Sequence, residues 1–308
     1  MMLRINSLPV EMPASPKEDP HAAKQVQELL GGKFGEMSTL MNYSYQSFSM
    51  RARKSIRPYY QLITNIAAEE YGHVEVVTAA INSCLNGGRT ELDDADDPTQ
   101  ANWQDYVGQG LGAHYVAAGH NALPVDSNGK GWSGEYVFSS GNLVLDLLSN
   151  FFLENGARTQ KLKVYQTTDN PAAREMLGYL FVRGAVHAMA YANALESLTG
   201  VNMKKMLPIP NIKNSDFPEA RKYMSQNMHL KMYKFTQEDI TQATAFWSGE
   251  APKNYTEGYG SHFEFVDEPP QSPADMSELQ GIASAFTPDY QPEEIMEIAN
   301  KLYKEAVG

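Results

Sequence analysis

Apolar residues recur every three or four positions in several long stretches of this 308-residue chain. In one of them Ile63, Ile66 and Val77 share such a spacing, which places them on a single face of a helix. The pattern predicts long helices over residues 22–50, 57–85, 140–167 and 171–199, and a shorter amphipathic helix over residues 292–306.

Residues that end helices mark the connections between these stretches. Gly87 follows the second stretch, and a short turn before Pro171 separates the third from the fourth, so the last two helices must be antiparallel neighbours. The second and third stretches are instead joined by about fifty residues, from Asn86 to Tyr136. One long crossover between two helical hairpins is typical of ferritin-like bundles.

Three glycines interrupt the first predicted helix: Gly31, Gly32 and Gly35. Each glycine within a helix costs up to about 1 kcal/mol relative to alanine. We expect the helix to continue through them, and the glycines to allow another backbone, such as a neighbouring helix, to approach closely.

The periodicity weakens after Gly200, and residues 248–275 are rich in glycine, proline and aromatic residues. We therefore predict an all-α fold, a ferritin-like four-helix bundle with one long crossover and an extended C-terminal segment with little regular structure. The expected divisions are an N-terminal arm (1–21), the bundle (22–200) and an extension (201–308) that wraps the bundle or a neighbouring subunit.

Composition excludes several classes of function. The net charge of −12 argues against a nucleic-acid binder and against an anionic membrane surface. The single cysteine, Cys84, excludes an intrachain disulfide, thiolate zinc sites and cysteine-bound iron–sulfur clusters, and we expect it to be buried and inert. No signal peptide or membrane-spanning stretch is visible, so we expect a cytoplasmic protein.

Five potential metal ligands fall on inward-facing stripes of the four predicted helices. Taken alone, a Glu-x-x-His pair is usually a solvated surface feature, and a single core histidine usually bonds to a backbone carbonyl. An unpaired carboxylate is costly to bury, however, and several helices that each direct one inward can build a two-metal site. The sequence predicts such a site, with redox chemistry, within residues 22–200 from Glu36, Glu70, His73, Glu154 and His187.

Two further residues lie two helical turns from predicted ligands. Tyr43 follows Glu36 by seven positions, and its hydroxyl could donate to a ligating carboxylate. Lys161 follows Glu154 by seven positions and is either a functional cation or a side chain that extends toward solvent. We interpret Tyr191 as a core residue and assign no metal role to His114, His120, His229 or His262.

The chain resembles the non-haem manganese catalases over most of residues 1–215. The resemblance rests on four runs of sequence, which are Leu30–Tyr43, Ala68–His73, Asn150–Glu154 and Arg183–His187. It implies a ferritin-like homohexamer that acts on hydrogen peroxide. It also implies two manganese ions per chain, bridged by oxo, hydroxo or water, and no haem.

Carried over by position, the resemblance implies that Glu70 is the carboxylate that bridges the two metal ions, or one of the bridges. Glu36 and His73 would complete the coordination of one ion, and Glu154 and His187 that of the other.

The chain departs from the usual pattern of two-metal carboxylate proteins at one position. A second Glu-x-x-His pair would place a carboxylate at position 184, where this chain has Gly184. In related chains of this type a lysine that matches Lys161 stands near the metals. The resemblance therefore makes Lys161 the candidate for handling protons or balancing charge.

Ligand types alone do not choose the metal, because carboxylate and imidazole suit manganese and iron alike. The alternatives are a di-iron carboxylate oxidase or ferroxidase, a low-turnover structural metal-binding coat protein, and a metal-free helical scaffold. Gly184 argues against the first, since di-iron sites usually have a fourth carboxylate.

Overall fold

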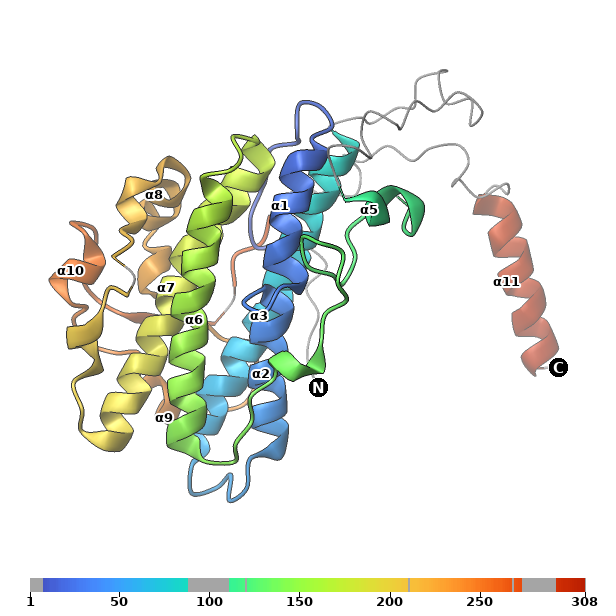
Figure 1. The fold of residues 1–308 in the computed structure, drawn as a ribbon. Coiled ribbons are helices and arrows are strands. Elements are labelled where there is room, and N and C mark those ends of the chain that lie inside the picture. The colour runs from blue at the N-terminus through green and yellow to red at the C-terminus, as the bar shows by residue number, and fades with distance from the viewer. Residues whose placement is uncertain are drawn as a thin grey trace.

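The computed structural model describes residues 8–87, 111–119, 121–209, 211–267, 269–272 and 292–307. Its long helices lie side by side as a bundle (Figure 1). They are α1 (Pro20–Gly31), α2 (Glu36–Ser49), α3 (Arg57–Asn86), α6 (Leu143–Tyr165) and α7 (Pro171–Thr199). The α3 helix contacts α1, α2 and α7, while α6 contacts α2 and α7. This arrangement confirms the all-α, ferritin-like prediction.

The prediction of one continuous helix over residues 22–50 is wrong, because the chain leaves the helix between Gly31 and Glu36. Gly32 and Gly35 are extended, with φ of −70° and −77°. A Cβ atom at Gly35 would lie 2.6 Å from the carbonyl oxygen of Leu30, so only glycine fits this tight turn. The expected close approach does occur at Gly31, where a Cβ atom would lie 2.3 Å from the Val125 carbonyl oxygen. The approaching segment is the crossover and not a helix.

The two helices of the second hairpin begin with capping residues that their sequence supplies. The Asn142 side chain accepts a hydrogen bond from the backbone of Leu145 at the start of α6. The Asn170 side chain accepts from Ala172 and Ala173 at the start of α7, which also has a proline in its first turn. These bonds satisfy backbone donors that a helix start otherwise leaves unpaired.

The described part of the crossover runs along the bundle to the start of α6 (Figure 1). It contains the short helix α5 (Gly112–Val116) and the 3-10 turn η1 (Gly134–Tyr136). Side chains of the first hairpin fix it in place. Gln27 donates to the carbonyls of Leu123 and Val125, and Asn42 donates to the carbonyl of Tyr136. Residues 88–110 of the crossover lie outside the described residues.

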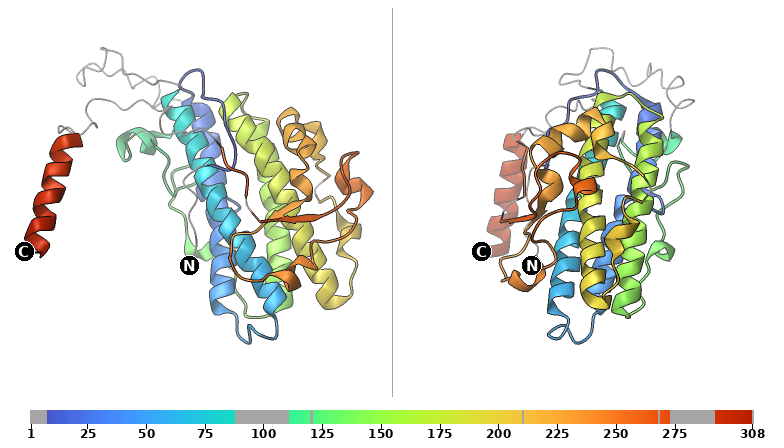
Figure 2. Two further views of the ribbon diagram at one scale, coloured as in Figure 1. Left: turned by 180° about the vertical axis from the view of Figure 1, so that it is seen from behind. Right: turned by 90° about the vertical axis from the view of Figure 1, so that its left-hand side faces the viewer.

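Residues 200–209 and 211–267 form short elements that pack on one side of the bundle (Figure 2). Among them α8 and η4 contact α7, and α9 contacts α3. The two short strands pair in parallel, with Met232 opposite Phe265. These elements are η2 (Met203–Met206), η3 (Asn214–Asp216), α8 (Pro218–Ser225), η4 (Met228–Leu230), β1 (Lys231–Tyr233), α9 (Thr241–Thr244), α10 (Lys253–Thr256) and β2 (Glu264–Val266).

The predicted final helix is present as α11 (Pro292–Val307). Its described side chains are exposed, including the apolar Ile298 and Leu302. Within the described residues, no helix combines the length and apolar character that crossing a bilayer requires.

Candidate metal centre

The five predicted metal ligands meet in the interior of the bundle, and none is more than 2% exposed. They come from four helices, so the site exists only when both hairpins are packed together. Glu36 is the first residue of α2, where the helix N-terminus favours a negative charge. The α3 helix supplies Glu70 and His73, α6 supplies Glu154, and α7 supplies His187.

Glu70 lies at the centre of this cluster. Its Oε2 is 3.1 Å from Nδ1 of His73, and its Oε1 is 2.7 Å from Nδ1 of His187. One carboxylate therefore faces both imidazoles, one oxygen to each. The two rings are stacked with centroids 5.4 Å apart, and ligand atoms of all three residues lie within 4.8 Å of one another.

Each of the two remaining predicted carboxylates lies beside a different histidine. Oε2 of Glu36 is 3.6 Å from Nδ1 of His73, and Oε1 of Glu154 is 3.5 Å from Nδ1 of His187. The geometry thus groups Glu36 with His73 and Glu154 with His187, and Glu70 lies between the two groups.

Polar side chains hold each carboxylate in place. The Tyr43 hydroxyl donates to Oε1 of Glu154 at 2.6 Å, and the Thr39 hydroxyl donates to Oε2 of Glu70 at 2.8 Å. Nζ of Lys161 lies 2.7 Å from Oε1 of Glu36. Lys161 is 2% exposed, so its side chain does not extend to solvent.

A fourth carboxylate, that of Glu69, also lies at the site, and sequence reasoning did not assign it a role. Its carboxylate pairs with Arg183 through two hydrogen bonds, of 2.5 and 3.0 Å. The same carboxylate lies 3.2 Å from Nε2 of His187 and 3.5 Å from Nε2 of His73. Each histidine therefore has Nδ1 toward the central carboxylates and Nε2 toward Glu69. A carboxylate behind a ligating imidazole fixes the orientation and tautomer of the ring.

The sequence does contain a signal for this pair. Arg183 precedes His187 by four positions and Glu69 precedes His73 by four, so each shares a helix face with a predicted ligand.

Burial opposes charge throughout the site, and neighbouring charges decide which groups stay ionised. Burial alone would lower the pKa of Lys161, but the adjacent Glu36 carboxylate raises it above its usual value. Burial would raise the pKa of Glu70, but the charge on His73 holds it well below the usual range. For Glu154, burial and the nearby Glu70 charge raise the pKa.

The donor set fits metal ions of the manganese and iron type. Of the four buried carboxylates, Glu36 pairs with the permanent cation Lys161 and Glu69 pairs with the permanent cation Arg183, while Glu70 and Glu154 lie beside His187. Among the described residues this leaves two negative charges for protonated histidines or bound cations to balance. Neither ring nitrogen of the buried His187 makes a well-directed hydrogen bond, so a lone pair is available for a metal. Carboxylate oxygen with imidazole nitrogen suits manganese and iron.

The space at Gly184, where many two-metal proteins have a carboxylate, is occupied by Arg158. A Cβ atom at Gly184 would lie 3.3 Å from Cγ of Arg158 and 3.8 Å from Oε2 of Glu154. The stem of a buried arginine therefore borders the metal centre at this point.

The remaining candidates lie away from the centre or play a packing role. Tyr191 packs against Tyr43, with ring centroids 5.3 Å apart. His114 bonds to Gln27, and burial lowers its pKa to about 4. Cys84 is buried, as predicted, and burial raises its pKa. His229 is buried outside the ligand cluster, His262 is part of an isolated bridge with Glu250, and His120 lies outside the described residues.

Fold and site together define a ferritin-like helical protein with a buried carboxylate–histidine cluster suited to metal binding. The chain belongs to the family of manganese containing catalases, whose pattern matches residues 4–307.

Individual relatives agree with this assignment. A manganese catalase of Bacillus subtilis is 33% identical over 266 residues, which cover 84% of this chain and 88% of that protein. A manganese catalase of Bacillus subtilis (strain 168) is 29% identical with the same coverage. The crystal structure of KatB, a manganese catalase from Anabaena, matches with a TM-score of 0.54 at 22% identity. That match covers 87% of this chain and all of the KatB chain, and it supports the fold.

Proposed function

We propose that this chain is a catalase that converts two molecules of hydrogen peroxide into two of water and one of dioxygen. We further propose that two manganese ions are held by Glu36, Glu70, His73, Glu154 and His187, with Glu70 shared between them. The observation that carries the two-ion proposal is the central position of Glu70, which directs one oxygen toward each histidine at 3.1 and 2.7 Å.

When bound, a manganese pair supplies the two-electron redox change that peroxide needs both as oxidant and as reductant. The protein's own residues orient the ligands and control protons. Tyr43 remains protonated, because burial and the charge on Glu154 raise its pKa well above 10, and its hydroxyl fixes Glu154. Lys161 also remains protonated, so it balances charge beside Glu36 and can donate a proton to an oxygen atom there.

An oxygen electrode tests the proposed reaction. Manganese-loaded protein is expected to release one dioxygen for every two peroxide molecules consumed, and Glu70→Gln is expected to lose that activity. An oxidase or ferroxidase would consume peroxide at bound iron without releasing dioxygen. A structural metal-binding protein would do neither at an appreciable rate. Either of those results would overturn the proposal.

The homohexamer, the cytoplasmic location and the division at residues 21 and 200 remain predictions. Sedimentation of the purified protein would test the first of these.

A further inference from the structure

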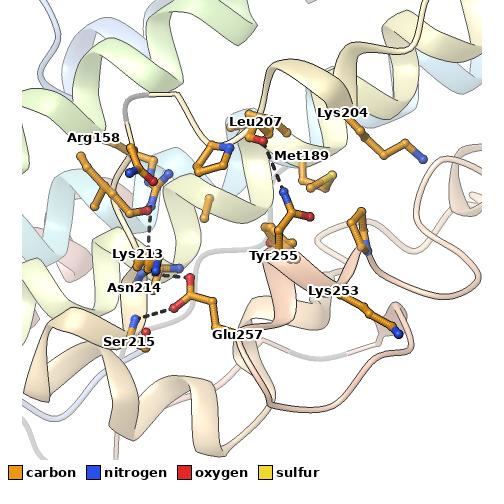
Figure 3. A pocket seen from close by; sticks show the side chains of 17 residues that line it. Arg158, Met189, Lys204, Leu207, Lys213, Asn214, Ser215, Lys253, Tyr255 and Glu257 are labelled. Carbon is orange, nitrogen blue, oxygen red and sulfur yellow. Dashed lines mark hydrogen bonds between the residues drawn. The ribbon is translucent and has the colours of Figure 1, made fainter.

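A pocket of about 480 Å³ lies on the outer side of α6 and α7, behind the metal centre. Figure 3 shows that residues of the C-terminal segment, including Lys204, Leu207 and Tyr255, form its other walls. A volume of this size is typical of sites that hold small organic molecules.

The charge of this pocket is opposite to that of the protein. The cations Arg158, Lys204, Lys213 and Lys253 line it, together with one carboxylate, that of Glu257, although the whole chain carries −12. The Glu257 carboxylate accepts hydrogen bonds from the backbone of Asn214 and Ser215, at 3.1 and 2.8 Å (Figure 3). Backbone donors of the pocket wall therefore already bind the Glu257 carboxylate.

Two of the lysines are available to a ligand. Lys204 is paired with Glu196 at 3.0 Å. Lys213 and Lys253 are exposed, and neither forms an ion pair with any described carboxylate. A ligand with negative charge would gain from both lysines without breaking an existing pair.

Arg158 lies at the base of the pocket and is only 4% exposed. Its Nη2 donates to Oδ1 of Asn214 at 2.8 Å and to the Ile212 carbonyl at 3.3 Å, while its Nε has no hydrogen-bond partner in the described structure. No described carboxylate forms an ion pair with it. A buried guanidinium outside any ion pair is costly, and its flat array of donors matches a carboxylate or phosphate group.

The wall formed by α7 is apolar. Ala185, Ala188 and Met189 face the pocket there, so a ligand with a short carbon chain would bury that chain against them. We propose that this pocket binds a small organic anion, one of whose acidic groups pairs with Arg158 while the rest of its charge faces Lys213 and Lys253. Because the stem of Arg158 borders Gly184 beside Glu154, the bound anion would lie one side chain away from the metal centre.

Isothermal titration calorimetry of the manganese-loaded protein tests this proposal, with succinate, citrate and inorganic phosphate as probes. At least one of them is expected to bind with one site per chain, and the uncharged diamide of succinate is expected not to bind. The double variant Lys213→Ala/Lys253→Ala should weaken binding by about five-fold or more. Lys163→Ala is the matched control, since this exposed lysine of α6 lies outside the pocket, and it should leave binding unchanged.

Arg158→Gln should abolish binding, with circular dichroism used to check that the variant folds. If it does not fold, the double variant decides, because both of its lysines are exposed. Absence of binding by all three anions at millimolar concentration would overturn the proposal. Unchanged affinity in the double variant would overturn it as well. Binding does not require turnover, so a failed proposal about catalysis would leave this test intact.

Discussion

Replacing Glu69 by glutamine removes a charge that three buried groups share, with little change in side-chain shape. Arg183 pairs with this carboxylate through two hydrogen bonds, and the Nε2 atoms of His73 and His187 lie 3.5 and 3.2 Å from it. Arg183 keeps its bonds of 2.7 and 2.8 Å to the carbonyls of Met228 and Lys231, so it would stay in place as a buried cation without a counter-ion.

The structure sets the scale of two separate effects. Breaking a buried ion pair by removing one partner costs about 3 to 5 kcal/mol, and the amide oxygen that replaces the carboxylate can still accept one hydrogen bond. We therefore expect Glu69→Gln to lower the free energy of unfolding by about 3 kcal/mol. Loss of a partner behind a ligating histidine typically weakens metal binding by about 10- to 100-fold, and this residue faces both histidines.

Two assays measure these effects independently. Urea unfolding of metal-free protein gives the change in stability, and competition with a chelator gives the change in manganese affinity. Glu135→Gln, an exposed residue of η1, is the control and should change neither quantity. If Glu69→Gln binds manganese as tightly as the wild type, Glu69 does not orient the histidines and this reasoning is refuted.

Three other substitutions test separate parts of the account. Lys161→Met leaves Glu36 without its cation, so the rate of dioxygen release in the oxygen electrode should fall by about 10-fold or more. Full activity in this variant would exclude a role for Lys161. Gly184→Glu places a side chain against Arg158, because the new Cβ atom would lie 3.3 Å from Cγ of Arg158. The free energy of unfolding should fall by about 2 to 4 kcal/mol. An unchanged melting temperature would contradict the described packing. Burial lowers the pKa of His114 to about 4 in the folded protein, against about 6.5 when unfolded, so folding favours the neutral ring. This preference for the neutral ring contributes about 2 to 3 kcal/mol to the free energy of unfolding above pH 6.5, and the contribution is lost as the pH falls toward 4. His114→Gln should therefore flatten the dependence of the free energy of unfolding on pH over that window. An unaltered pH dependence would argue against this assignment.

The bundle could be predicted because long helices leave a periodic record in the sequence. The stripe through Ile63, Ile66 and Val77 requires only local spacing, and α3 has the extent that this spacing indicates. The break before Glu36 could not be predicted in the same way. The cost of glycine in a helix is small enough to be tolerated, so the sequence alone does not distinguish a helix that continues through Gly32 and Gly35 from one that ends before them.

The five proposed ligand positions could also be chosen from the sequence, because each is a charged or imidazole group on an apolar stripe. Glu69 could not be assigned in the same way, because its partner Arg183 lies 114 positions away and only the fold brings the two together. The pocket at Arg158 was missed for a similar reason. Its outer wall comes from residues 204–215 and 252–257, where short turns replace the periodic pattern that makes helices predictable.

We propose that five residues from four helices hold two manganese ions with Glu70 between them. Anomalous diffraction from crystals of the manganese-loaded protein, recorded on both sides of the manganese absorption edge, tests this arrangement. Two manganese peaks per chain are expected, one beside Glu36 and His73 and the other beside Glu154 and His187, both within bonding distance of Glu70. A single peak, or peaks away from these residues, would contradict it.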